Sequence, residues 1–230
     1  GHTYASIAGL VGGYDNNIQG EYAAVVGGYN NTASGTYSVA GGGNSVTASG
    51  ISSFAAGGIG NIASSTATTA IGGENNQATG TASTASGGHS NLTSGGHSGV
   101  FGGYSSSATN SYSVVAGGRD NTASGSWSAI VGGQLNSALT SYSSVFGGYS
   151  NLAQTNIHTT ALGGYDNTVT GPYATVSGGY SNYASGQYSS ISGGYDNTAA
   201  ELRGRFEENF PQFEEFVDDK VKAAGIRRAA

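Results

Sequence analysis

A Gly-Gly pair returns every 15 residues along most of this 230-residue chain, and that spacing limits the possible folds more than any other feature. The spacing is 15 each time except for one step of 16, between residues 147 and 163. Short fixed periods are typical of solenoids, in which each repeat is one coil stacked on its neighbours. We therefore expect thirteen stacked coils, with a one-residue insertion within residues 154–158 that bulges from a turn. The pairs start at residues 12, 27, 42, 57, 72, 87, 102, 117, 132, 147, 163, 178 and 193.

Each repeat contains two short runs of strand length, such as Tyr142–Phe146 and Tyr149–Ala153. Four or five residues between glycine-rich turns cannot sustain a helix. The sequence thus predicts an all-β chain, a parallel β-solenoid (β-roll) over residues 1–200. Because neighbouring strands lie about 4.8 Å apart, thirteen coils make a rod roughly 60 Å long.

Two columns of small apolar residues run through the aligned repeats and form the predicted core, which is thin. One column contains Ala, Val or Ile in every coil from Val25 to Ile191. The other runs from Ala33 to Ala199 and contains one polar residue, Thr93.

A third column carries Asn in eleven of the thirteen coils, with Val46 and Ser106 as the exceptions. Stacked Asn side chains can hydrogen-bond along the stack and satisfy the backbone of a turn. We interpret this column as structural. The Gly-Gly pairs are interpreted as turns that need positive φ or close backbone passage.

Tyrosine gathers in two columns, eight residues apart, that are expected to lie at the surface or in an interface, since one of them also contains Glu74. The rings either protect the strands and contribute packing, which we favour, or form an adhesive surface that binds a partner. Trp127 lies in the second column. The aromatic residues are Tyr14, Tyr29, Tyr104, Tyr149, Tyr165, Tyr180 and Tyr195 in the first column, and Tyr22, Tyr37, Tyr112, Trp127, Tyr142, Tyr173 and Tyr188 in the second.

Composition argues against several classes of protein. The net charge is −6, and residues 1–200 contain a single basic residue, Arg119, which disfavours nucleic acid. With no Cys, disulfides and thiolate metal sites are excluded. No apolar run is long enough to cross a bilayer. The chain begins at Gly1 and lacks Met, so we expect a processed product, and a secreted mature protein fits.

Catalytic, cofactor and metal sites are not expected. His2, His89, His97 and His158 have no regular carboxylate partner in the repeat, and Asp recurs in too few coils to supply calcium ligands. Ice binding also ranks low, because threonine is scattered instead of forming a ladder.

The last thirty residues, 201–230, are rich in charge and predict a short amphipathic helix near 210–224. This tail is interpreted as a cap on the last coil or, alternatively, as an assembly element that packs on another copy. Its apolar stripe consists of Phe206, Phe210, Phe213, Phe216, Val217 and Val221.

The segments YSVVAGGRDNTASGSWSAIVGG (112–133) and YSSISGGYDNTA (188–199) resemble the head repeats of YadA-like trimeric autotransporter adhesins. The resemblance covers residues 1–200. It implies a left-handed parallel β-roll, three chains side by side, and attachment of a bacterial cell surface to host or environmental surfaces.

Two hypotheses follow. In the first, the chain is an extracellular adhesive and structural rod that associates with itself, as a homotrimer, and binds a surface, a glycan or a matrix protein. In the second, it is the subunit of an extracellular filament that polymerises head to tail through its solenoid ends and tail. Ice binding or enzymatic activity is a distant third.

Overall fold

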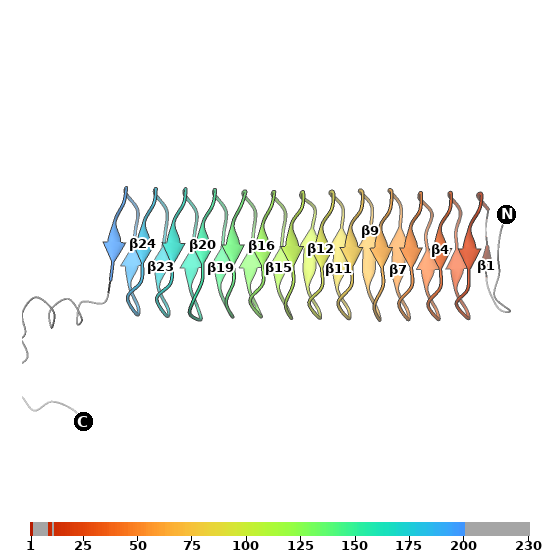
Figure 1. Cartoon of the computed structure of the whole chain (residues 1–230), viewed down its shortest axis with the longest axis horizontal. Coiled ribbons are helices and arrows are strands. Elements are labelled where there is room, and N and C mark those ends of the chain that lie inside the picture. Colours follow the sequence, from red (N-terminus) through yellow and green to blue (C-terminus); the bar gives the residue numbers. More distant parts are fainter. Residues whose placement is uncertain (2–8, 11, 201–230) are drawn as a thin grey trace, which may run out of the picture.

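A computed structural model describes residues 1, 9–10 and 12–200, and these residues form one parallel β-solenoid (Figure 1). Each coil contributes one strand to each of two 13-stranded sheets that lie face to face. The all-β parallel solenoid of about thirteen coils is therefore confirmed. The predicted tail helix and the tail boundary at residue 201 fall outside the described residues.

The odd-numbered strands form one sheet and the even-numbered strands form the other. The first sheet contains β1 (Gly9–Leu10), β3 (Ala24–Val25), β5 (Val39–Ala40), β7 (Phe54–Ala56), β9 (Thr69–Ile71), β11 (Thr84–Ser86), β13 (Gly99–Phe101), β15 (Val114–Val115), β17 (Ala129–Ile130), β19 (Ser144–Val145), β21 (Thr160–Ala161), β23 (Thr175–Val176) and β25 (Ser190–Ile191). The second contains β2 (Asn17–Ile18), β4 (Thr32–Ala33), β6 (Thr47–Ala48), β8 (Ile62–Ala63), β10 (Gln77–Ala78), β12 (Leu92–Thr93), β14 (Ser107–Ala108), β16 (Thr122–Ala123), β18 (Ser137–Ala138), β20 (Leu152–Ala153), β22 (Thr168–Val169), β24 (Tyr183–Ala184) and β26 (Thr198–Ala199).

Strands pair with their counterparts one repeat later, so like residues lie over like residues. In β17 and β19, for example, Ile130 pairs with Val145. Most strands have only two residues, and Tyr142 and Tyr149, expected to begin strands, lie outside them. The expected runs were too long because the coil reverses direction twice within 15 residues, which leaves most of each repeat to the turns.

The core follows the two predicted apolar columns. In the first column, from Val25 to Val176, and in the second, from Ala33 to Ala184, at most 1% of the surface of each residue is accessible to solvent. Thr93 occupies an inward position of β12 and compensates with a hydrogen bond from its hydroxyl to the Ser83 hydroxyl at 3.2 Å. A core of Ala and Val is thin, so the two sheets approach closely.

The Asn column forms the predicted ladder inside the Gly-Gly turns. In a typical rung, the Oδ1 of Asn136 accepts a hydrogen bond from the backbone N–H of Asn151, 2.9 Å away in the next coil. Its Nδ2 donates to the carbonyl oxygens of Gly132 and Gly148, at 3.0 and 3.1 Å. Each Asn therefore ties a Gly-Gly turn to itself and to the following coil, which confirms its structural interpretation.

The ladder is incomplete at Ser106, and filling it is expected to stabilise the solenoid. The Ser106 hydroxyl lies 3.3 Å from the backbone N–H of Asn121 and cannot reach the glycine carbonyls that an Asn would bind. We expect Ser106→Asn to raise the free energy of unfolding by about 1 kcal/mol, since it adds amide hydrogen bonds to Gly102 and Gly118. Thermal denaturation followed by circular dichroism measures this change. A lower melting temperature would contradict the role given to the ladder.

The one-residue insertion leaves the stack intact, as expected. Ser144 of β19 pairs with Thr160 of β21, sixteen residues later, and Leu152 of β20 pairs with Thr168 of β22. The extra residue is absorbed in the turn between β20 and β21, where Thr155 has a φ of 76°. The Oγ1 of Thr140 donates to the carbonyl oxygen of Asn156 at 2.6 Å and holds the bulge against the preceding coil.

Candidate functional site: two aromatic ladders and a groove

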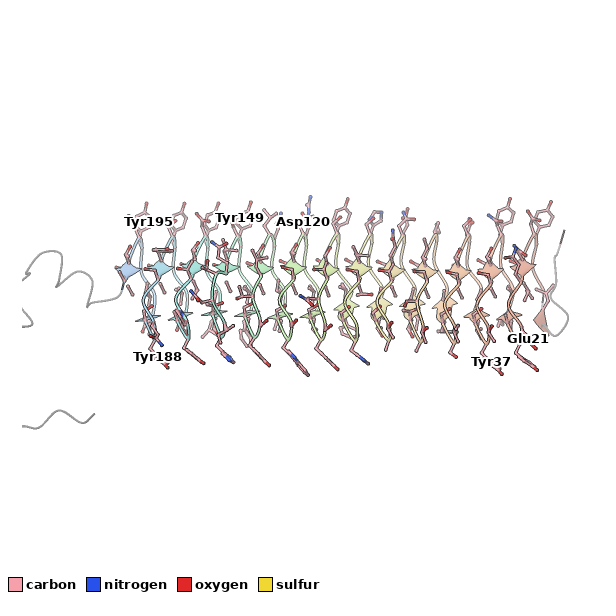
Figure 2. The ribbon with its side chains drawn as sticks, turned by 60° about the horizontal axis from the view of Figure 1, so that its bottom comes forward. Glu21, Tyr37, Asp120, Tyr149, Tyr188 and Tyr195 are labelled. Carbon is pink, nitrogen blue, oxygen red and sulfur yellow. The ribbon has the colours of Figure 1, made fainter. Side chains whose placement is uncertain are left out.

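The two tyrosine columns lie on opposite long edges of the solenoid (Figure 2). The edge that contains the Gly-Gly turns, called here the Gly-Gly edge, carries the first column, with Tyr149 and Tyr195 among its members. The other edge, called the opposite edge, carries the second column, including Tyr37 and Tyr188. The side chains point away from the body of the rod at both edges. The apolar interior takes no part in either column.

Nearly all the aromatic residues singled out from the sequence lie exposed at these edges. Except for Tyr149, which is half-buried, between 42% and 73% of each residue is accessible. Glu74 is exposed as well, as its place in a surface column requires. The exposed residues are Tyr14, Tyr29, Tyr104, Tyr165, Tyr180 and Tyr195 on the Gly-Gly edge, and Tyr22, Tyr37, Tyr112, Trp127, Tyr142, Tyr173 and Tyr188 on the opposite edge.

Neighbouring rings within a column stack face to face. On the Gly-Gly edge, Tyr165 and Tyr180 have ring centroids 4.9 Å apart and planes inclined by 2°. Stacked aromatic pairs contribute about 0.5–1.5 kcal/mol beyond the area they bury. The ladders therefore contribute packing, one of the two roles considered for them, while their outer rims remain open to solvent.

The second column continues without a break through seven rings on the opposite edge. Sequence reasoning missed one of them, His158, because the insertion displaces it by one residue from the 15-residue frame. Its ring lies 4.7 Å from that of Tyr142 and 4.9 Å from that of Tyr173. Counting back five residues from the Gly-Gly pair at 163 would have found it, since Tyr142 precedes the pair at 147 by the same five residues. The seven rings belong to His97, Tyr112, Trp127, Tyr142, His158, Tyr173 and Tyr188.

Residues of the second column adopt a left-handed backbone conformation, which could not be read from the repeat. Tyr112, Trp127 and Tyr142 have φ values of 59°, 61° and 60°. Such values are rare for bulky residues and cost on the order of 1 kcal/mol each. The same position is left-handed in coils that lack a ring, with φ values of 54°, 56° and 55° at Ser52, Ala67 and Ala82, so the conformation belongs to the turn of every coil.

The aromatic ladders are interrupted between residues 44 and 82, where the columns contain Asn44, Ile59, Glu74 and small residues. On the Gly-Gly edge, Arg119 and Gln134 make a second interruption, and the guanidinium carbon of Arg119 lies 5.4 Å from the ring centroid of Tyr104. The opposite edge is therefore the one with a long uninterrupted aromatic surface.

A shallow groove of about 530 Å³ lies beside this surface, at the insertion. It is lined by residues 124–126, 139–141 and 155–157 of three successive coils, together with Asn110. Each of the three segments leads directly into a ring of the second column, namely Trp127, Tyr142 or His158. One feature of the sequence, the insertion, pointed to this place, but it was interpreted only as a bulge.

Charge is nearly absent from this part of the rod. Between residues 75 and 200, the charged side chains are Arg119, Asp120, Asp166 and Asp196, and all four follow a Gly-Gly pair at the Gly-Gly edge. Within residues 75–200, the opposite edge and the groove therefore carry no Lys, Arg, Asp or Glu side chain, while Glu21 lies on the same edge nearer the N-terminus. A ligand of the groove meets no carboxylate, ammonium or guanidinium group of this part of the rod.

The remaining residues that the sequence singled out are not among the described residues of this edge or of the groove. The apolar stripe of the tail, from Phe206 to Val221, and His2 lie outside the described residues. Within residues 9–10 and 12–200, no group of three or more His, Asp or Glu side chains gathers in a way that could hold a metal ion. In the same range, the structure contains no helix long and apolar enough to cross a bilayer.

Threonine forms isolated pairs within the sheets. Thr69 lies directly beside Thr84 in the first sheet, and Thr32 lies beside Thr47 in the second. These pairs do not extend into a ladder, because the columns are broken by residues such as Phe54 and Ile62.

No protein-family model and no curated protein sequence matches this chain. The parallel β-solenoid that the adhesin-head resemblance implies is present. What the resemblance adds about assembly and attachment is a proposal.

Proposed function

We propose that this chain is a rigid adhesive rod of an extracellular structural protein, in the manner of the YadA-like heads that its repeats resemble. Copies of the rod associate side by side through an aromatic edge, and the assembly attaches to a surface. The observation that carries the proposal is the ladder of seven stacked rings whose outer rims stay exposed along the opposite edge.

The scarcity of charge supports the same function. Association through tyrosine rims and small hydroxyl side chains depends little on ion pairs, so it should persist when salt screens charges. A rod with a chemically uniform edge is suited to many weak, parallel contacts, whose combined avidity exceeds that of each contact.

Electron microscopy and sedimentation of the purified chain test the proposal. We expect discrete short bundles of parallel rods, trimers by resemblance, whose stoichiometry is unchanged when the ionic strength is raised about tenfold. Tyr112→Ser, Tyr142→Ser and Tyr173→Ser combined should dissociate them, because they remove every second ring of the long ladder. Tyr14→Ser and Tyr29→Ser on the Gly-Gly edge are the matched control. Monomers at all concentrations would overturn the proposal.

A head-to-tail filament is the second candidate, favoured by the last described coil. There β25 and β26 pair on one side only among the described residues, and Tyr195 and Tyr188 are the most exposed rings of their columns, at 73% and 69%. An unpaired strand edge can recruit another chain. Long uniform threads in the micrographs, lost on deletion of residues 201–230, would establish this candidate and the assembly role of the tail.

A further inference from the structure

The groove at the insertion has the chemistry of a binding site for a neutral, hydroxyl-rich ligand. Several of its polar groups are unused by the fold: the hydroxyls of Ser126, Ser141 and Thr155 make no hydrogen bond to the described residues. The side-chain amide nitrogen of Asn110 is free in the same sense, while its Oδ1 accepts from the Ser111 backbone at 2.8 Å. These groups offer both donors and acceptors at the surface.

Apolar and aromatic groups border these hydroxyls. Leu139 and Ile157 line the groove and are 38% and 45% exposed. The ring of Trp127 is displaced along the neighbouring ladder: it lies 6.5 Å from the ring of Tyr142, the widest separation between stacked rings in either column, and 4.0 Å from the ring of Tyr112. Rings that are not fully covered by each other can contact the C–H face of another molecule.

Taken together, these features select a ligand class. With no Lys or Arg side chain in its lining, the groove is poorly suited to phosphates, sulfated polymers and acidic peptides. A peptide cannot add a strand here either, because β16, β18 and β20, which lead into the turns that line the groove, are paired on both sides. A shallow groove with mixed hydroxyl, amide and aromatic groups instead matches a sugar, which has apolar C–H faces and a rim of hydroxyls.

We infer that the groove bounded by residues 124–126, 139–141 and 155–157 binds a short stretch of neutral polysaccharide. The inference rests on the proposed adhesive function, for which it names the ligand class and the place of contact. Trp127 and Tyr142 contact the face of a sugar ring, and the hydroxyls of Ser126, Ser141 and Thr155 bond its hydroxyl groups. The insertion creates the site by breaking the regular 15-residue turn.

The experiment uses the full chain and its own reporter. Trp127 is the only tryptophan, so its fluorescence reports directly on the edge of the groove. Cellohexaose, chitohexaose and mannohexaose are titrated separately, with calorimetry as a second measurement. We expect a saturable change with at least one of them, unaffected by an about tenfold rise in ionic strength. No saturable change with any of the three, or binding that salt abolishes, overturns the inference.

Three variants locate the site. Deleting Thr155 restores the 15-residue period, and Ser126→Ala with Ser141→Ala removes two hydroxyls; each should weaken binding by about tenfold or more. Thr66→Ala with Thr81→Ala changes the same column in coils that lack the groove and should leave binding unchanged. Circular dichroism verifies that each variant folds. Equal losses in the Thr66/Thr81 control overturn the inference.

The two proposals fail separately. If bundles form normally but no hexasaccharide binds, the proposed adhesive rod is retained and the inferred polysaccharide site is rejected. If a hexasaccharide binds to a chain that stays monomeric, the proposed self-association is rejected and the groove is retained as a binding site.

Discussion

Replacing Gly133 with alanine is expected to lower the free energy of unfolding by about 3 kcal/mol or more. Gly133 has a φ of 82°, which residues other than glycine and asparagine rarely adopt. A methyl group there would also overlap the carbonyl oxygen of Gly148 in the next coil and the Nδ2 of Asn136. Neither neighbour can withdraw, since one is backbone and the other is held in the Asn ladder.

The adjacent glycine is the matched control. Gly132 has no positive φ, and a methyl group at this position meets no atom within 4 Å. We expect Gly132→Ala to change stability by about 0.5 kcal/mol or less. Urea unfolding followed by circular dichroism measures both variants. Equal effects of the two substitutions would show that the second glycine of each pair is not needed for coil contact.

Asn136→Ala is expected to cost about 2–4 kcal/mol, because it leaves buried backbone groups without partners. The backbone N–H of Asn151 and the carbonyl oxygen of Gly132 lose the hydrogen bonds that Asn136 provides at 2.9 and 3.0 Å. The carbonyl oxygen of Gly148 keeps another donor, the backbone N–H of Gln134, 2.9 Å away. The loss is therefore concentrated on two groups.

Hydrogen exchange gives this prediction a local readout. The amide of Asn151 should exchange faster in Asn136→Ala than in the parent chain, since its acceptor is gone. Asn44→Ala is the control, because Asn44 is exposed and belongs to the surface column. A control that is as unstable as Asn136→Ala would contradict the ladder as the source of the effect.

Sequence reasoning succeeded where one physical requirement repeats in every coil. The apolar columns from Val25 and Ala33 onward, the Asn ladder and the Gly-Gly turns each answer a need that recurs every 15 residues, so periodicity reveals them. It predicted strands that were too long, as at Tyr142 and Tyr149, because alternation does not show where a chain reverses. Turn conformation in this fold is set by contact between coils, which no single repeat contains.

The candidate site was predictable only in part, for the same reason. The surface position of the tyrosines followed from Glu74 in their column. The ring of His158 could be found only by counting back from the Gly-Gly pair that follows the insertion. The left-handed backbone of Trp127 and the groove could not be foreseen, since they depend on the exact geometry of the turns. In a solenoid, features that depart from the period are those that distinguish one coil from another.

The in-register pairing of every coil with its neighbour has a consequence for how such a molecule can evolve. An in-frame duplication or loss of one repeat creates no contact of a new kind, since each added residue meets the same partners as its counterpart in the original. The length of the rod can thus change in steps of one strand spacing, while the pairing within its two sheets is inherited unaltered.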